Sequence, residues 1–346
     1  MTTRLPVAAI AAFAERAFVR VGVPETNALK ASRLLVESDL AGQDGHGIFR
    51  LPQYIGNILS GRVEPAASIQ VVSEAPASAL VDGGNGLGHL VMARATELAI
   101  EKAKTQGSAW IGVRRSNHAG AASIWASAML PHDMIGIYMA VGSNNFMAPW
   151  GGYERLLGTN PVAIAVPAMD EPPVVVDMAT SIAANGKIQM ARQRGEMIPE
   201  GWVIDRDGKP ITDPHKIDQG VLLPAGDYKG YALALMIGLI AGTLNEAAFG
   251  READRKTGPS NTGQAVCAIS IDRFGEVGAF KRRIDTISRE FRNSGRLPGV
   301  ESVRLPGERS FETRRERTEL GVPLPPSLLS VLDKLASELG IEPLAR

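Results

Sequence analysis

The sequence lacks the residues that several common kinds of protein need. It has one cysteine, Cys267, in 346 residues, so an internal disulfide and a cysteine-rich metal site are both excluded. Cys267 lies in the apolar run 265–269, where we expect a buried core thiol rather than a nucleophile. Basic and acidic residues balance at 37 each. A chain without net charge gives no reason to expect nucleic acid or an anionic membrane as partner.

Long apolar runs are also missing. The longest, residues 231–244, is shorter than the roughly 20 residues that a membrane-spanning helix needs. The apolar N-terminal stretch is interrupted by Glu15 and Arg16, which favours an amphipathic first helix over a signal peptide. We therefore expect a cytoplasmic protein, and a chain of this length predicts two or three domains.

The motifs of the commonest enzyme classes are absent. The glycine-rich segment 83–88 lacks G-x-G-x-x-G spacing, and no acidic residue follows it at a strand end about 20 positions on, so a plain turn is favoured. No Walker A motif, zinc-binding H-E-x-x-H or Cys/His spacing, or G-x-S-x-G elbow is present. The sequence therefore predicts no P-loop, no zinc site and no hydrolase triad of the usual kind.

Hydrophobic periodicity predicts a mixed α/β chain. Apolar spacing typical of helices occurs in residues 5–60 with a break near Pro24, and in 90–106, 121–130, 231–244, 283–293 and 326–339. Strand-like runs occur at residues 68–82, 109–113, 135–141, 162–166, 174–178 and 266–271. The arginine-rich segment 314–317 is expected to be a solvated helix face.

Two of the five histidines lie in turns of small polar residues. His118 lies in Ser116-Asn117-His118-Ala119-Gly120, and His46 lies in Asp44-Gly45-His46-Gly47. Histidine is the side chain best suited to transfer protons near neutral pH. The two turns together indicate a proton-transfer site. Of the other histidines, His132 and His215 follow prolines and are interpreted as loop residues, and His89 closes the glycine-rich turn and is left outside the candidate site.

Further polar turns follow predicted strands or open predicted helices, at residues 158–161, 177–181, 227–231 and 305–308. Backbone amides and hydroxyls in such turns can hold a phosphate. Lys229 places a cation at a helix start, where it is electrostatically disfavoured unless it faces an anion. Taken singly, each turn is also consistent with a capping role.

Taken in order, these segments resemble the malate/L-lactate dehydrogenase family, also called the type-2 malate/lactate or ureidoglycolate dehydrogenase family. The resemblance spans about residues 5–340 and rests on DGHGIFRLPQY, SNHAG, APWGG with LLGTNP, DMATS with NGK, WVIDRDGKPITDP, YKGYALAL and LPGE.

The resemblance implies a homodimeric oxidoreductase that uses NAD or NADP and acts on small 2-oxo acids and their 2-hydroxy or 2-amino counterparts. It implies a cofactor domain that is not a Rossmann fold but is built on a large, mostly antiparallel sheet, and a helical domain formed by both termini. The expected boundaries are residues 1–72 with 310–346 for the helical domain, 73–120 with about 285–309 for a connecting catalytic region, and 121–284 for the NAD(P)-binding domain.

The resemblance also assigns roles. His46, Arg50, Tyr54 and His118 are the expected substrate contacts, with His118 and His46 as proton-transferring residues. A guanidinium is suited to clamp the substrate carboxylate, and Tyr54, four residues after Arg50, would share its helix face. The expected cofactor contacts are Thr180, Ser181, Asn185, Gly186, Tyr228, Lys229, Pro306, Gly307 and Glu308. Because the cofactor domain is not a Rossmann fold, the usual acidic-residue rule leaves NAD and NADP open.

Two positions depart from the family pattern. Many relatives have a serine where this chain has Gly45, and the cyclic-imine reductases have an acidic residue where it has Lys187. In those reductases both residues are thought to support the first histidine as proton donor. We therefore expect His118 rather than His46 to transfer the proton, and a hydroxy acid rather than an imine as substrate. An imino-acid reductase is the alternative, and a non-catalytic dinucleotide-binding protein is a remote one.

Overall fold

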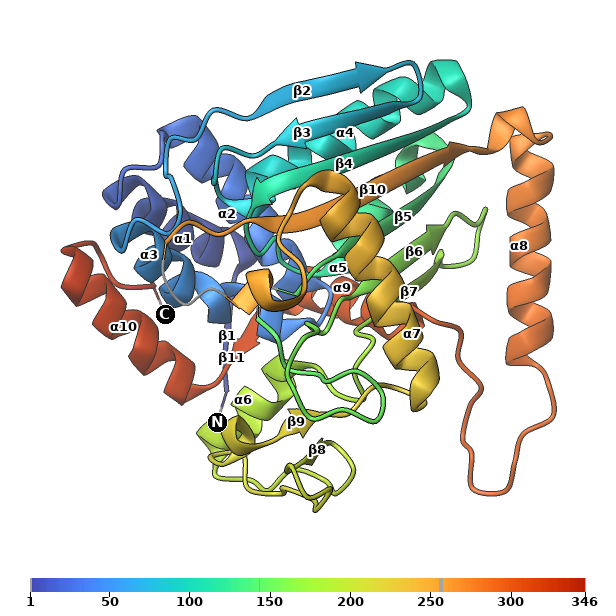
Figure 1. Ribbon diagram of the computed structural model, residues 1–346. Coiled ribbons are helices and arrows are strands. Elements are labelled where there is room, and N and C mark those ends of the chain that lie inside the picture. The colour runs from blue at the N-terminus through green and yellow to red at the C-terminus, as the bar shows by residue number, and fades with distance from the viewer. Residues whose placement is uncertain (1, 143, 255–257, 346) are drawn as a thin grey trace.

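A central sheet of seven strands organises the molecule (Figure 1). The structure, a computed structural model, describes residues 2–142, 144–254 and 258–345. The strand order is β2-β3-β4-β10-β5-β6-β7, and of these neighbours β3 and β4 pair in parallel while the others pair antiparallel. The strands are β2 (Gln70–Ala75), β3 (Ser78–Asp82), β4 (Ser108–Ser116), β5 (Met134–Ala140), β6 (Val162–Val166), β7 (Val174–Met178) and β10 (Thr262–Ser270). This confirms the expected mixed α/β class and the large, mostly antiparallel sheet.

Helices surround this sheet, and two short strand pairs lie outside it. The helices are α1 (Val7–Arg20), α2 (Glu25–Leu40), α3 (Leu51–Leu59), α4 (Gly88–Gln106), α5 (Ala122–Ser127), α6 (Asn185–Arg194), α7 (Tyr228–Ile237), α8 (Val277–Arg292), α9 (Glu308–Leu320) and α10 (Pro326–Leu339). The strand pairs are β1 (Thr3–Leu5) with β11 (Val322–Leu324), and β8 (Val203–Ile204) with β9 (Val221–Leu222). Within the residues that the structure describes, no helix is both long and apolar enough to cross a membrane.

The sheet is covered on both faces. Helices α4 and α5 bury one face, with Trp125 and Val266 in the shared apolar core. Helix α7 packs on the other face, where Ile237 meets Ala265. Because side chains alternate along β10, Cys267 points to the same face as Ala265, beyond the cover of α7. The expectation of a fully buried thiol is therefore corrected, since Cys267 is only half-buried.

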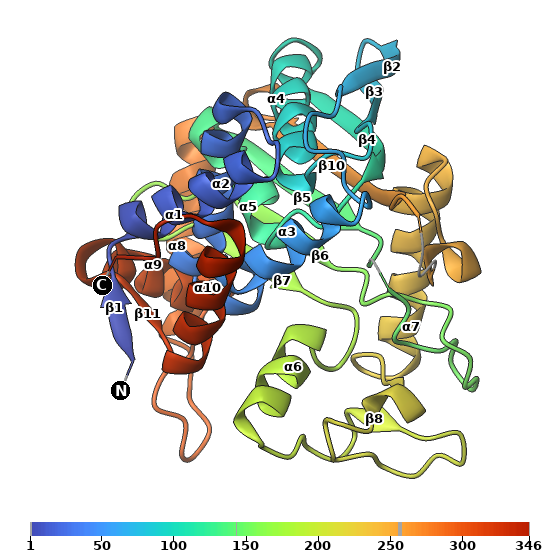
Figure 2. The same cartoon turned by 90° about the vertical axis from the view of Figure 1, so that its left-hand side faces the viewer.

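Both ends of the chain contribute to one apolar core. Side chains of α1, α2 and α3 pack there with side chains of α10, including Phe13, Phe18 and Leu332. Strand β1 pairs with β11 in the register Thr3 to Leu324. Figure 2 shows α10 beside these N-terminal helices.

Several elements differ from the sequence expectations. The predicted helical region 5–60 is interrupted at residues 44–50 by two short 3-10 turns, η1 (Asp44–His46) and η2 (Ile48–Arg50). The predicted helix at 231–244 begins at Tyr228 as α7 and continues after Ile237 through a π turn and a 3-10 turn. Helix α6 and strands β8 and β9 lie where no element was predicted. Helix α6 is polar and shows no apolar periodicity, and two-residue strands are too short to show any.

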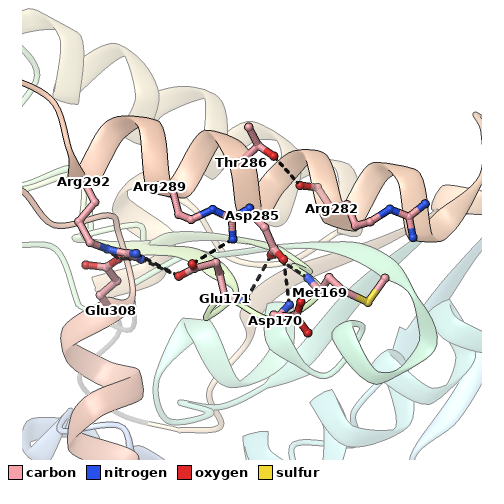
Figure 3. A network of polar contacts seen from close by, with 9 residues as sticks. All are labelled: Met169, Asp170, Glu171, Arg282, Asp285, Thr286, Arg289, Arg292 and Glu308. Carbon is pink, nitrogen blue, oxygen red and sulfur yellow. Dashed lines mark hydrogen bonds and ion pairs between the residues drawn. The ribbon is translucent and has the colours of Figure 1, made fainter.

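Polar contacts fix α8 at the edge of the molecule (Figure 3). The buried carboxylate of Asp285 accepts backbone N–H groups of Met169, Asp170 and Glu171, at 3.0, 3.0 and 3.3 Å. Burial alone would raise the pKa of Asp285, but these three N–H groups outweigh it and hold the pKa below its usual value. The carboxylate thus ties α8 to the turn between β6 and β7.

Replacing Asp285 with alanine should therefore destabilise the protein, because three part-buried N–H groups lose a charged acceptor. We expect a loss of about 3 kcal/mol, measured by thermal or urea unfolding. The matched control is Thr286→Ala, whose hydroxyl bonds within α8 to the Arg282 carbonyl. Equal losses in the two variants would contradict the anchoring role of Asp285.

Candidate active site

The loop that carries His46 and Arg50 joins α2 to α3 and is held by a buried carboxyl group. Asp39, near the end of α2, is 1% exposed and accepts the backbone N–H of Ile48 at 2.8 Å. A side chain at residue 47 would overlap the Asp39 carboxyl group, so the loop needs Gly47 at this point. The two short 3-10 turns on either side of Gly47 thereby pack directly against the end of α2.

The turn that carries His118 follows β4. The Asn117 side-chain amide donates to the Gly86 carbonyl at 2.9 Å, and Gln264 of β10 donates to the Asn117 carbonyl at 3.1 Å. Gly88 starts α4 directly against this turn, because a Cβ there would overlap the Asn117 carbonyl oxygen. The glycine-rich segment 83–88 is therefore a turn that supports His118.

These two loops bring the histidines into contact. Nδ1 of His46 lies 3.2 Å from Nε2 of His118, and the rings are nearly parallel at an interplanar angle of 5°. On the other side of the His118 ring, the Tyr54 hydroxyl lies 2.5 Å from Nδ1. Tyr54, His118 and His46 thus form one hydrogen-bonded chain.

The contacts of His118 indicate which nitrogen carries its proton. The backbone N–H of Gly120, which can only donate, points at Nδ1 from 3.4 Å. Nδ1 therefore accepts, and we assign the proton of neutral His118 to Nε2, directed at Nδ1 of His46. The Tyr54 hydroxyl then donates to Nδ1.

Both histidines are neutral at physiological pH. Burial lowers the pKa of His118 well below its usual 6.5, and Arg50, His46 and His89 lower it further. Burial and Arg50 lower the pKa of His46 to about 4, against an opposing effect of Asp177. A neutral imidazole can accept a proton, so the pair is prepared to act as a base.

Arg50 presents a guanidinium without an acidic partner. Its Nε donates to the Gly45 carbonyl at 2.8 Å and its Nη1 to the Gln53 side chain at 2.7 Å. Arg50 takes part in none of the ion pairs between described residues. It therefore keeps donors for an anion from outside the protein.

A cavity of about 510 Å³ opens beside these groups. It lies where several strands begin or end, so side chains from β5, β7 and β10 reach it along with the two histidine loops. His46, Arg50 and His118 line it, as do Ser181, Gly186 and Lys187 near the start of α6, and Gln43, Tyr138, Asp177 and Gln264. A second cavity of about 680 Å³ shares Gln43 and Asp177 with the first.

The expected cofactor residues are distributed around these cavities. Ser181 and Gly186 line the first cavity and Gly307 lines the second, whereas Thr180 is fully buried and donates to the Thr159 carbonyl. Tyr228 and Lys229 are exposed at the start of α7. Two other expected contacts interact within the protein: the Pro306 carbonyl accepts the Val175 N–H, and Glu308 pairs with Arg292. The side chain of Asn185 lies outside the part of the chain that the structure describes.

Tyr54 lies behind His118, with 2% of its surface exposed, and does not line the cavity. His89 lies behind it in turn, fully buried and edge-on to the Tyr54 ring at 5.4 Å between centroids. Neither ring nitrogen of His89 has a hydrogen-bond partner among the described residues. Sequence reasoning left His89 out because nothing in the pattern shows which buried group a helical histidine will face.

Asp177 and Gln43 are further site residues that sequence reasoning missed. Asp177 accepts the Gln43 side-chain amide and the Ser123 backbone N–H, both at 2.8 Å. Its place at the end of β7, in a polar turn, was the available signal. Gln43 gave none.

A family model described as malate/L-lactate dehydrogenase matches residues 5–333 of this sequence. The chain belongs to the malate/L-lactate dehydrogenase family. Malate dehydrogenase from Pyrococcus horikoshii is 37% identical, over 98% of this chain and 96% of that protein. The Delta(1)-pyrroline-2-carboxylate/Delta(1)-piperideine-2-carboxylate reductase of Pseudomonas putida is 33% identical over 96% of each chain. The structure of malate dehydrogenase from Entamoeba histolytica matches with a TM-score of 0.94 at 30% identity, covering 99% of each chain.

The buried carboxyl group of Asp39 makes the folding stability of this protein depend on pH. Its pKa is raised from 3.8 to about 8, mainly by burial and further by the nearby Asp44. The hydrogen bond from the Ile48 N–H and the charge of Arg317 act in the opposite direction and lower it. Because the folded value exceeds the unfolded one, the stability that the neutral carboxyl contributes is present below about pH 4 and is lost as the pH rises to about 8.

An Asp39→Asn variant should remove this dependence, because asparagine keeps an acceptor for the Ile48 N–H and cannot ionise. We expect the melting temperature of the variant minus that of the unchanged protein to become more positive as the pH rises from about 4 to about 8, because only the unchanged protein loses stability over this range. The control is Asp207→Asn, at an exposed position. A difference between Asp39→Asn and the unchanged protein that does not vary with pH would show that Asp39 is already ionised in the folded state.

Proposed function

We propose that this protein is an NAD(P)-dependent dehydrogenase that interconverts a small 2-hydroxy acid and its 2-oxo acid. The observation that carries the proposal is the pair of neutral histidines, His46 and His118, beside the unpaired guanidinium of Arg50 in one cavity. Such an acid needs a cation for its carboxylate and a proton acceptor for its hydroxyl, and these three residues supply both.

Arg50 binds and orients the substrate. Its guanidinium forms parallel hydrogen bonds with the C1 carboxylate, which fixes the direction of the C2 substituents. This carboxylate also offsets the positive charge that lowers the pKa of both histidines in the free protein. The proton affinity of the pair thus rises once substrate is present.

His118 transfers the proton, with His46 as the second candidate. During oxidation the substrate hydroxyl takes the place of His46 at Nε2 of His118. For this step His118 takes the other neutral tautomer: the Nε2 proton of the free protein is released to solvent and a proton is taken up at Nδ1, which donates to the Tyr54 oxygen 2.5 Å away. Nε2 can then accept the hydroxyl proton. During reduction the protonated His118 returns that proton to the carbonyl oxygen. Tyr54 is thus a positioning residue.

The cavity suits a nicotinamide dinucleotide, which when bound exchanges the hydride with C2 of the substrate. Gln264 lies in the cavity wall, 1% exposed, with an Oε1 that has no hydrogen-bond partner among the described residues, an acceptor suited to a carboxamide N–H. The start of α6 lines the same cavity with Ala184 and Gly186, where backbone N–H groups favour phosphate. Ser181, Asn185, Tyr228, Lys229 and the turn 306–308 complete the proposed cofactor contacts, for NAD and NADP alike. Thr180, which is fully buried, supports the turn that carries Ser181.

The proposal includes the organisation implied by the family. The dinucleotide-binding domain, residues 121–284, is not a Rossmann fold, and the antiparallel pairing of β10, β5, β6 and β7 supports this. Residues 1–72 with 310–346 form the helical domain, and 73–120 with about 285–309 form the connecting region. A cytoplasmic homodimer is also proposed, and the outward-facing apolar side chains Leu233, Met236 and Leu239 support a second copy.

Reduction of a cyclic imino acid is the second candidate, favoured by the similarity to the Pseudomonas putida reductase. Lys187 lines the cavity where those reductases place an acidic residue. A cation there suits an anionic substrate better than an iminium, so the hydroxy-acid reaction is preferred.

Replacing His118 with alanine should lower kcat by ~10²–10⁴-fold if it transfers the proton. Steady-state kinetics in both directions would measure this. The control is His132→Ala, at an exposed position outside both cavities. Near-normal turnover by a folded His118→Ala protein would transfer the role to His46.

A panel of C3 to C6 oxo acids, with NADH and NADPH and with or without added amine, would test the reaction. We expect oxidation of the cofactor by at least one oxo acid without amine, because Arg50 and His118 are both matched to a 2-oxo acid. Product that forms only when amine is present would support the imine reductase instead. Absence of turnover with every oxo acid, despite cofactor binding, would favour a non-catalytic protein.

A further inference from the structure

Arg317 is a buried cation with no part in the proposed reaction. It lies on α9, is 9% exposed, and was expected from the sequence on a solvated helix face. That expectation is wrong, because Arg317 donates to the Asp39 carbonyl at 2.6 Å and pairs with the carboxylate of Asp44. The partners lie 278 and 273 residues away in the sequence.

These contacts lie at the base of the loop that carries His46 and Arg50. Asp39 is near the end of α2, and Asp44 opens the first 3-10 turn of the loop. Within the loop, the backbone N–H groups of His46 and Arg50 donate to the carbonyls of Gln43 and Gly47, each three residues back. The position of the loop therefore depends on contacts with other elements: Arg317 and the Gln43–Asp177 hydrogen bond at its start, and the Asp39–Ile48 hydrogen bond in its middle.

Helix α9, which carries Arg317, is held in place by contacts near both of its ends. Close to Arg317, the α9 residue Thr313 packs against Gly42, where a Cβ would lie 3.0 Å from its methyl carbon. At the other end of α9, Glu308 pairs with Arg292, which also pairs with Glu171 (Figure 3). The helix is thus fixed at both ends.

We propose that Arg317 is a positioning residue that sets the place of His46 and Arg50 in the active site, acting through Asp44. This inference rests on the proposed function. The hydrogen bond between the two histidines, at 3.2 Å, tolerates little movement of the loop. A displacement of about 1 Å near reacting groups can lower the rate by ~10²-fold.

Direct electrostatics do not account for such a role. Apart from burial, the groups that shift the pKa of His46 are Arg50 and Asp177, and neither Arg317 nor Asp44 is among them. Arg317 therefore affects His46 by moving the loop. Movement that lets water reach the ring would raise the pKa of His46 from about 4 toward 6.5.

Four variants test the proposal kinetically. Arg317→Met and Asp44→Asn each remove the ion pair, Arg317→Lys keeps the charge, and Arg315→Met makes the same change at an exposed arginine of α9 that has no ion pair among the described residues. We expect Arg317→Met and Asp44→Asn to lower kcat/KM for the oxo acid by ~10- to 100-fold, because the displaced loop carries His46 and Arg50. Cofactor affinity should stay within about twofold, because the proposed cofactor contacts lie outside this loop. Arg317→Lys should recover part of the loss, and combining the two damaging changes should add little to either alone.

A second measurement needs no substrate. Titration of His46 followed by NMR should show a higher pKa in Arg317→Met and Asp44→Asn than in the unchanged protein, a smaller rise in Arg317→Lys, and no change in Arg315→Met. An unchanged His46 titration in folded variants would overturn the proposal, as would an equal loss for oxo acid and cofactor. If no oxo acid is turned over but the His46 shift is present, the proposed function fails while the positioning role stands.

Discussion

The hydrogen bond between His46 and His118 is the interaction on which the rest of the site depends. It joins two loops 72 residues apart in the sequence, and each ring must lie in a position where burial disfavours its charged form. Neutral imidazoles can share one hydrogen bond because one donates and the other accepts. Two charged rings at this distance would repel each other, so burial and contact support the same protonation state.

The sheet makes this contact possible by ending several strands at one place. The turn with His118 follows β4, and Asp177 is the last residue but one of β7. The antiparallel β10 begins nearby, which brings Gln264 to the same cavity. A parallel sheet would place all strand ends of one sense together, whereas antiparallel pairing mixes starts and ends. The helical layer then closes the cavity with the loop between α2 and α3, positioned by Asp39 and Arg317.

Features that depend on local sequence could be predicted, and those that depend on distant partners could not. The strand before His118 and the turn after it follow from apolar alternation and glycine, so His118 was identifiable. Arg317 was misplaced because its partner Asp44 is 273 residues away, and an arginine-rich helix resembles a solvated one locally. Helix α6 was missed because its polar residues show no apolar stripe, and its start lies against the loop at Gly45. Tyr54 shares a helix region with Arg50 as expected, but the 3-10 turn before α3 sends the hydroxyl to His118 and leaves Arg50 at the cavity.

In the proposed reaction, the charge of Arg50 links substrate binding to proton transfer. In the free protein this guanidinium lowers the pKa of both histidines, which keeps them neutral and able to accept a proton. A carboxylate bound at Arg50 would cancel that charge within a few ångströms of the rings, and at low local dielectric such a change alters proton affinity strongly. The histidines would then hold a proton best when an acid occupies the cavity. In the proposed reaction one arginine both binds the substrate and adjusts the acid–base pair, which fits its place beside the start of α6 without an ion pair to a described acidic residue.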